Sequence, residues 1–178
     1  MKSPHSPYLS SPLLIAIFIG FTGPNSPAAI WEVPGRSATR IQTAIDHAEA
    51  GDTVLVRPGV YRESVRLKPG ITLRSLGNDA PGKLGLLRAE STVIDGTSLP
   101  PDAPGVRMAA GAVLDGFTVA NFGRYDDARW RHHHATSGNE QSHDHIGVPG
   151  NAGILVQGVD CTLKNNIVHH IGRSGIGI

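Results

Sequence analysis

The sequence predicts an all-β solenoid of stacked coils, a parallel β-helix, closed at its N-terminal end by one α-helix. Three observations favour this class: a repeat of roughly 20 to 25 residues, turn residues about every eight to twelve positions, and one amphipathic segment ahead of the first strand. We expect about four or five coils, because each coil of such a fold uses some 20 residues.

The repeat consists of short apolar motifs, two of which end in Asp-Gly. Val93-Ile94-Asp95-Gly96 recurs as Val113-Leu114-Asp115-Gly116, looser versions occupy 72–75 and 162–165, and Gly153-Ile154 recurs at Gly175-Ile176. The steps are 21, 20, 49 and 22 residues. A single coil cannot bury its inward Val, Ile and Leu, so stacked coils are required. Leucine-rich repeats have a similar period, but they need regularly spaced leucines, and the inward positions here are mixed.

The first expected element is a helix over residues 39–50. Thr39 and Gln42 have the spacing of a capping box, and Ile41, Ala44 and Ile45 fall on one face. Gly51 ends the helix. Strands then follow within 52–77, separated by turns at Pro58-Gly59 and Pro69-Gly70.

Residues 1–28 are expected to be a secretory signal peptide. Lys2 precedes a nine-residue apolar run from Leu13 to Phe21, and small residues before Ala29 suggest cleavage after Ala28. An uncleaved anchor is the alternative, although a membrane span needs about 20 apolar residues. The domain 29–178 would then be secreted or periplasmic, with no transmembrane span after cleavage.

Charge and cysteine content exclude some functions. Sixteen Lys and Arg balance fifteen Asp and Glu, which gives no bias toward nucleic acid. Cys161 is the single cysteine, so an intrachain disulfide cannot form, and we expect it to be a small buried hydrophobic residue.

Asp95 and Asp115 occupy equivalent positions of the repeat, which predicts that they stack on successive coils about 4.8 Å apart. Two readings are open. The carboxylates are either oxygen ligands for Ca²⁺ or corner residues that accept hydrogen bonds from local backbone amides.

The segment from Ile41 to Gly77, with "AGDTVLVRPGVY" at its centre, resembles the opening of secreted right-handed parallel β-helix proteins of the pectate-lyase-like superfamily. The stretches "VLDGFTVANFG" and "CTLKNNIVHHIGRSGIGI" are similar to the coils of that family, so the resemblance covers about residues 31 to 178. It implies a capping helix, a polysaccharide partner, and a groove along one sheet face bordered by loops. It also implies an Asn ladder inside the coils, for which Asn165 and Asn166 are candidates.

Family members with known activity are mostly lyases, hydrolases and epimerases of acidic glycans, and others are binding or assembly proteins. We therefore expect either a polysaccharide lyase-like or glycoside hydrolase-like chain, or a non-catalytic protein for structure, glycan binding or metal handling. Active members usually have more coils and a capped end. The chain is accordingly expected to be an N-terminal part of such a fold, whose last coil is open to pairing or oligomerisation.

A His-rich insertion around 122–150 interrupts the coil repeat and is the main candidate site. Five of the nine histidines lie between His132 and His145. The insertion either lines a substrate groove, holds a zinc or copper ion, or is a polar loop without a site. The candidates for substrate binding are Arg124, Asp126, Asp127, Arg129, Arg131, His132 and His134. The metal candidates are His143, Asp144 and His145. His169 and His170 are expected at a strand end, with one of them facing out.

Overall fold

The computed structural model describes residues 27–36, 38–123, 127–136, 152–172 and 174–178. The chain is mostly β, with three sheets in which every paired strand is parallel. The signal-peptide prediction falls on residues 1–28, of which 1–26 lie outside the described part. No helix in the described part is long and apolar enough to cross a membrane.

The first sheet has the strand order β1 (Ile30–Val33), β2 (Thr53–Val56), β5 (Thr72–Ser75), β8 (Val113–Asp115) and β11 (Thr162–Lys164). The second contains β3 (Gly59–Tyr61), β6 (Thr92–Asp95), β9 (Thr118–Ala120) and β12 (Ile167–His169). The third contains β4 (Val65–Arg66), β7 (Val106–Arg107), β10 (Ile154–Leu155) and β13 (Ile176–Gly177).

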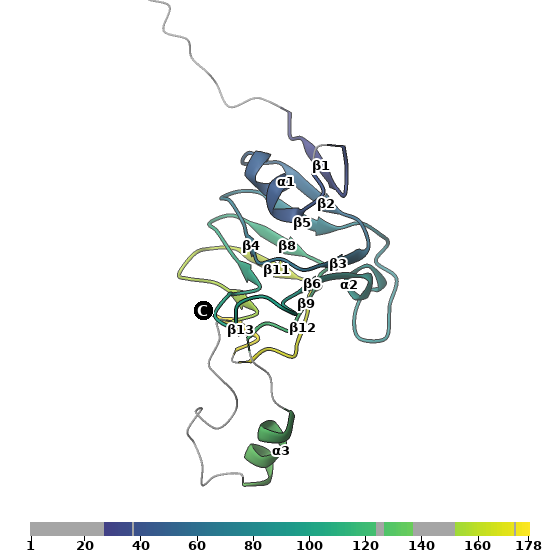
Figure 1. The fold of residues 1–178 in the computed structure, drawn as a ribbon. Helices are drawn as coiled ribbons and strands as arrows, with labels where there is room; N and C mark the ends of the chain where they lie inside the picture. Colours follow the sequence, from purple (N-terminus) through teal and green to yellow (C-terminus); the bar gives the residue numbers. More distant parts are fainter. Residues whose placement is uncertain (1–26, 37, 124–126, 137–151, 173) are drawn as a thin grey trace, which may run out of the picture.

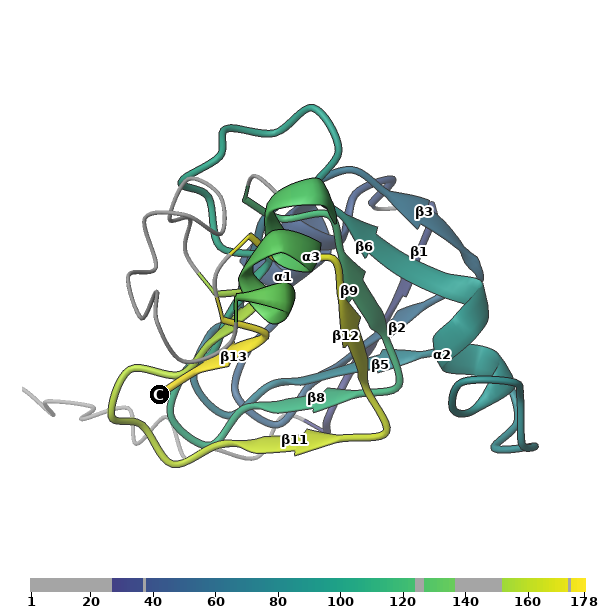
Figure 2. The ribbon, with the colours of Figure 1, turned by 90° about the horizontal axis from the view of Figure 1, so that it is seen from below.

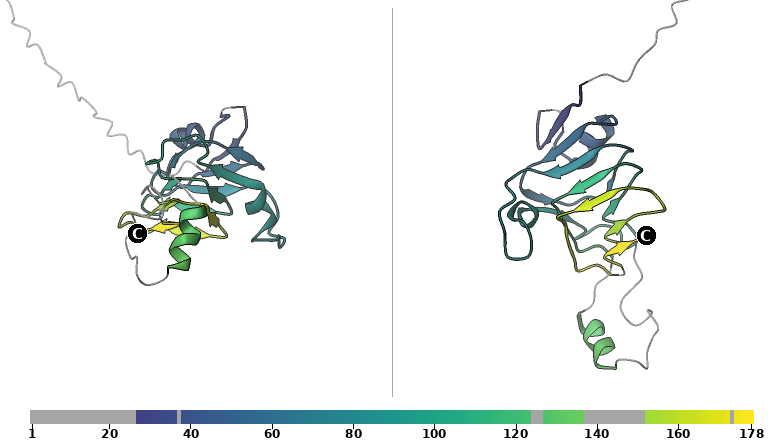
Figure 3. Two further views of the ribbon diagram at one scale, coloured as in Figure 1. Left: turned by 60° about the horizontal axis from the view of Figure 1, so that its bottom comes forward. Right: turned by 180° about the vertical axis from the view of Figure 1, so that it is seen from behind.

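The chain passes through the first, second and third sheets in the same order in each coil. Figure 1 shows the coils stacked from the N-terminal strand β1 down to β13, and Figure 2 looks along the stack, where the sheets form the sides of each coil. The strands of the first sheet lie one above another in Figure 3. This arrangement is compatible with the expected parallel β-solenoid.

The strand register corrects the expected repeat. Thr53, Thr72, Val113 and Thr162 are in register in the first sheet, so the successive coils advance by 19, 41 and 49 residues. The match of 72–75 with 113–116 and 162–165 is confirmed, as is that of Ile154 with Ile176. The match of 93–96 with 113–116 is wrong, because β6 belongs to the second sheet and β8 to the first. Both motifs mark the end of a strand at an Asp-Gly corner, but the two corners lie at different positions of the coil.

The core is a column of inward aliphatic side chains. Val54, Leu73 and Leu114 follow one another in register on the first sheet and are fully buried. Ile94 and Val119 do the same on the second sheet, and Val65, Val106 and Ile154 on the third. Burying each such side chain contributes about 1.5–3 kcal/mol. Cys161, expected to be buried, is half-buried and packs against the edge of this core.

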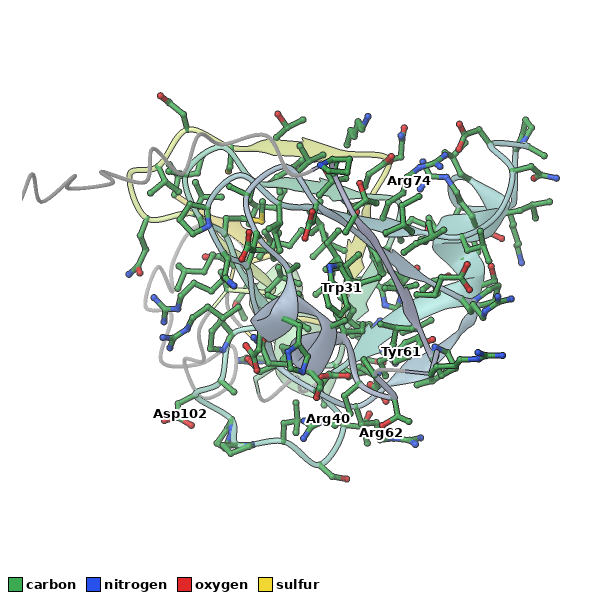
Figure 4. The ribbon with its side chains drawn as sticks, turned by 90° about the horizontal axis from the view of Figure 1, so that it is seen from above. Trp31, Arg40, Tyr61, Arg62, Arg74 and Asp102 are labelled. Atoms are coloured by element: carbon green, nitrogen blue, oxygen red, sulfur yellow. The ribbon has the colours of Figure 1, made fainter. Side chains whose placement is uncertain are left out.

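The helix α1 (Ile41–His47) covers the N-terminal end of the column with Ile41, Ala44 and Ile45 fully buried. Trp31 packs beside it, and its indole N–H donates to Asp52 Oδ2 at 3.0 Å. Figure 4 looks onto this end and shows Trp31 over the middle of the coils. The predicted capping helix is confirmed with shorter bounds.

The predicted capping box at Thr39 and Gln42 is wrong. Arg40 is the N-cap residue and makes no side-chain cap bond. The buried Glu63, which lies between β3 and β4, accepts hydrogen bonds from the backbone N–H groups of Ile41 and Gln42 at 2.9 and 3.1 Å. The end of the helix is therefore satisfied by a tertiary contact, and this contact ties α1 to the coil beneath it.

We expect Glu63→Ala to lower the free energy of unfolding by about 1–2 kcal/mol, because it removes the cap and leaves two helix N–H groups without an acceptor. Urea unfolding measures the change. Glu49→Ala is the matched control: its side chain is exposed, so its effect should stay within about 0.5 kcal/mol. Equal effects of the two substitutions would contradict the role given to Glu63.

Candidate functional site

The outer face of the second sheet forms the floor of a groove. Val93, Thr118 and Ile167 make one in-register row, and Asp95, Ala120 and His169 make the next. A hollow of about 260 Å³ lies on this face, and a second of about 510 Å³ lies at the corner just past the ends of β6, β9 and β12; Asn121 lines both. The larger hollow is lined by Gly96, Thr97, Ser98, Leu99, Pro101, Asn121, Gly123 and His170.

Two excursions of one coil border this groove. One spans 76–91 and contains α2 (Leu87–Ser91), which enters β6; the other spans 96–105 and leaves β6. Figure 2 shows α2 at one end of β6 and the 96–105 loop beyond the other end. Lys83, Leu84 and Glu90 line the groove from the first excursion, and Thr97 to Leu99 line it from the second.

These excursions were missed at the level of sequence because the mistaken match at 93–96 hid the length of the coil. The signal was present: "NDAPG" at 78–82 and "PPDAPG" at 100–105 are clusters of turn residues. Such clusters indicate loops that leave regular structure. The described walls of the groove come from these two excursions, and Gly123, at the start of the His-rich insertion, also lines it.

A buried arginine fastens the 76–91 excursion to the coils. The Arg88 guanidinium donates from Nη2 to Asp115 Oδ1 at 2.6 Å and from Nη1 to Ser75 Oγ at 3.0 Å and to the Asp115 carbonyl at 2.9 Å. Its Nε donates to Asp79 Oδ1 at 2.5 Å. The group thus joins both ends of the excursion to the corner between the first and second sheets.

Asp115 is held by several cations at this corner. Besides Arg88, Arg74 Nε lies 3.2 Å and Lys164 Nζ 3.7 Å from Oδ2, and Asn165 Nδ2 donates to Oδ1 at 2.9 Å. Burial by itself would raise the pKa of Asp115, but the hydrogen bonds from Arg88 and Asn165 outweigh it and lower that pKa. Asp115 is therefore an ionised structural group.

The glycine after Asp115 is required by this contact. Gly116 has φ +82°, and a Cβ at this position would lie 1.7 Å from Arg88 Nη1 and 2.7 Å from Ser75 Oγ. A side chain at 116 and the guanidinium of Arg88 cannot occupy the same space. Asn166 supports the same turn by accepting from the Phe117 N–H at 2.9 Å and donating to the Leu114 carbonyl at 3.0 Å.

Asp95 is a corner residue of the groove. Its Oδ1 accepts from the Thr97 N–H at 3.1 Å, the Thr97 hydroxyl at 2.8 Å and Asn121 Nδ2 at 2.8 Å, and Arg62 Nε lies 3.4 Å from Oδ2. Burial raises its pKa, yet the bonds from Asn121 and Thr97 bring that pKa below the ordinary value. The corner reading of Asp95 is confirmed.

The expected stacking of Asp95 on Asp115 is wrong. The two residues end strands of different sheets, Asp95 in register with Ala120 and Asp115 with Arg74 and Lys164. Their carboxylates are engaged by Arg62 and Arg88 respectively. They therefore do not fit a shared Ca²⁺ site, and among the described residues no group of three His, Cys, Asp or Glu side chains could hold a metal.

Glu90 lines the groove but also has a structural role. Its carboxylate accepts hydrogen bonds from the backbone N–H groups of Leu84 and, at 3.1 Å, Gly85. These bonds lower the pKa of Glu90. The carboxylate is ionised at neutral pH and holds the turn of the 76–91 excursion.

His169 and His170 lie at the groove edge of β12, with His169 half-buried and His170 exposed, as expected for a strand end. Their Nδ1 atoms are 2.5 Å apart and their rings meet edge-on. Burial, followed by the neighbouring His170, lowers the pKa of His169. Its imidazole is therefore neutral at pH 7, with one nitrogen able to donate and the other to accept.

The His-rich insertion is described only in part. α3 (Asp127–Ala135) lies beyond the C-terminal end of the coils in Figure 3, and Arg131 Nη2 pairs with Asp127 Oδ2 at 3.2 Å on an exposed surface. His132 is exposed in the same helix. Arg129 and His134 belong to α3 by their backbone, and their side chains lie outside the described part. Five further candidates lie wholly outside the described part: Arg124, Asp126, His143, Asp144 and His145.

Comparison with protein-family models, with curated proteins and with solved structures finds no match to this chain. The interpretation of the site therefore rests on its geometry: a mostly β chain of parallel sheets that carries a loop-bordered groove on one sheet face.

We expect Arg88→Met to lower the free energy of unfolding by about 3 kcal/mol, at the low end for breaking a buried ion pair, because Arg74 and Lys164 still face Asp115. Arg74→Met is the matched control on the same carboxylate; its side chain is 38% exposed, and we expect a loss of less than about 1 kcal/mol. The double variant Arg88→Met/Asp115→Leu should recover part of the loss. A loss for Arg88→Met no larger than that for Arg74→Met would argue against the anchor.

Lowering the pH should weaken the interactions of Asp115 at the corner between the first and second sheets. A carboxyl whose pKa is lower in the folded than in the unfolded chain stabilises the fold above the ordinary Asp value of about 3.9, and this stabilisation is lost as the pH falls through the folded pKa. Urea unfolding between pH 7 and pH 2.5 should therefore show a decline below about pH 4. Asp115→Asn should make this decline shallower, and an unchanged pH profile would count against the ionised role of Asp115.

Proposed function

We propose that the chain is a secreted protein of the right-handed parallel β-helix type, related to the pectate-lyase-like superfamily, and that it binds a polysaccharide along the groove of the second sheet. The groove carries the proposal: a hollow on the sheet face and a second at the adjoining corner, both lined by Asn121, with excursions at both ends of β6. Support for secretion comes from the N-terminal sequence pattern.

The groove offers the chemistry that a sugar chain needs. Sugars combine hydroxyl groups with apolar ring faces, and binding sites for such ligands place a few polar groups among apolar ones. Here Asn121, Ser98 and His169 provide polar groups, and Leu84, 70% exposed, and Pro101 provide apolar surface. An open groove of this kind suits a segment inside a long chain.

Binding is better supported than catalysis. Lyase and hydrolase chemistry needs a positioned acid and base, usually with shifted pKa values near the working pH. The carboxylates of Glu90 and Asp95 both have lowered pKa values and hydrogen bonds to the protein itself. Among the described residues, His169 favours a catalytic alternative, because its imidazole is neutral at pH 7 and a neutral imidazole is a base.

Affinity measurements on a panel of neutral, uronate and sulfated polysaccharides test the proposal. We expect His169→Ala to weaken binding about three- to tenfold, the value of one hydrogen bond, and Leu84→Ser to weaken it as well. Leu55→Ser is the matched control, because Leu55 lies on the outer face of the first sheet, away from the groove. Absorbance of unsaturated products in the same mixtures reports the lyase alternative.

Two outcomes would reject groove binding. One is an absence of binding to every polysaccharide of the panel. The other is binding that Leu84→Ser and His169→Ala leave unchanged while Leu55→Ser weakens it, which would move the contact to the first sheet.

A further inference from the structure

A third hollow lies on the outer face of the third sheet. β4 and β7 pair in parallel with Arg66 opposite Arg107, while Val65 and Val106 of the same strands are buried in the core. The two arginine side chains therefore leave adjacent strands on the same, outer face, about 4.8 Å apart at the backbone. They border a hollow of about 430 Å³ that is also lined by Gln42, Asp46, Ser64, Val65 and Pro104.

The positive charges of Arg66 and Arg107 are not paired with described carboxylates, unlike those of the cations on the first sheet. In the first sheet an in-register column alternates in sign, with Asp115 between Arg74 and Lys164. In the third sheet Arg66 is followed by Arg107, and no described carboxylate lies within 4.0 Å of either guanidinium. Like charges on neighbouring strands repel and destabilise the fold. A bound anion would remove that repulsion.

The walls of the hollow are held in shape by contacts that leave the Arg66 guanidinium unused and engage only Nη1 of Arg107. Gln42 of α1 accepts from the Arg66 N–H at 2.7 Å and donates to the Arg66 carbonyl at 3.3 Å, which fixes the strand against the helix. The Ser64 hydroxyl donates to the Pro104 carbonyl at 2.6 Å, which fixes the far wall. Arg107 Nη1 donates to Gln157 Oε1, which orients one guanidinium.

The carboxylate of Asp46 limits which ligands can enter this hollow. Asp46 is the only carboxylate among the described lining residues, and its Oδ1 accepts from Gln42 Nε2 at 2.8 Å. It lies on the helix side of the hollow, whereas the arginines lie on the sheet side. One negative group set between two guanidinium forks is well matched to such a site, because each fork can give two parallel hydrogen bonds to an oxyanion.

We propose that Arg66 and Arg107 form a binding site for an oxyanion group, a carboxylate or a sulfate, on the third sheet. This site is separate from the groove on the second sheet and does not depend on the function proposed for it. The oxyanion is either a free ion or a substituent of an acidic glycan, and the two sources share the same contacts.

The test measures binding of sodium sulfate and sodium glucuronate to the full chain by calorimetry and by thermal shift, with ionic strength held constant by sodium chloride. We expect saturable binding, and in Arg66→Gln/Arg107→Gln a dissociation constant at least tenfold higher, as expected when two charged contacts are lost. Arg36→Gln is the control, since Arg36 is exposed and does not line the hollow. Circular dichroism verifies folding; the Gln42 bonds to Arg66 use its backbone and persist in the variant.

A second arm separates the two sources of the oxyanion. Oligogalacturonate and a sulfated oligosaccharide are compared with glucuronate and sulfate at equal concentrations of charged groups. If the oligosaccharides bind at least tenfold more tightly than glucuronate and sulfate, and the double variant loses this binding, the oxyanion belongs to a glycan. If the oligosaccharides and the small anions bind equally, the ligand is a free ion. Anion binding that is the same in the double variant, in Arg36→Gln and in the unmodified chain would overturn the site. His169→Ala should leave anion binding unchanged.

Discussion

The parallel register between coils is the constraint on which the rest of this structure depends. Each coil has to return to the first sheet opposite the same residues of the coil before it, as Thr53, Thr72, Val113 and Thr162 do. The inward column of Val54, Leu73 and Leu114 exists only in that register. Coils of 19, 41 and 49 residues satisfy it equally, so additional residues have to leave the stack at its corners.

The groove is a product of this constraint. The 41-residue coil places its additional residues before and after β6, and the two excursions become walls on either side of an otherwise plain sheet face. An excursion can shape a ligand site only if it is held firmly against the coils. Arg88 holds the 76–91 excursion through Asp115, and Asp95 holds the 96–105 loop through Thr97. The 96–105 loop also reaches the hollow of the third sheet through Pro104.

The sequence predicted the elements that depend on local pattern. Alternating apolar residues identified the inward column, and Ile41, Ala44 and Ile45 identified the face of the capping helix. It failed where a contact joins residues far apart along the chain: Glu63 caps α1 from 22 residues away, and Arg88 reaches Asp115 across 27. It also took Asp95-Gly96 and Asp115-Gly116 for the same point of a coil, since local sequence encodes a corner but not which sheets the corner joins.

Gly116 and Arg88 have a consequence for how this fold can vary among related chains. The guanidinium occupies the space that a Cβ at 116 would fill, and Asp115 is its counter-charge. Positions 88 and 115 should therefore change together, and a side chain at 116 is tolerated only where the arginine at 88 has been replaced. An insertion between Asp79 and Leu84 leaves the contacts of Arg88 and Glu90 in place, so relatives should differ in length there.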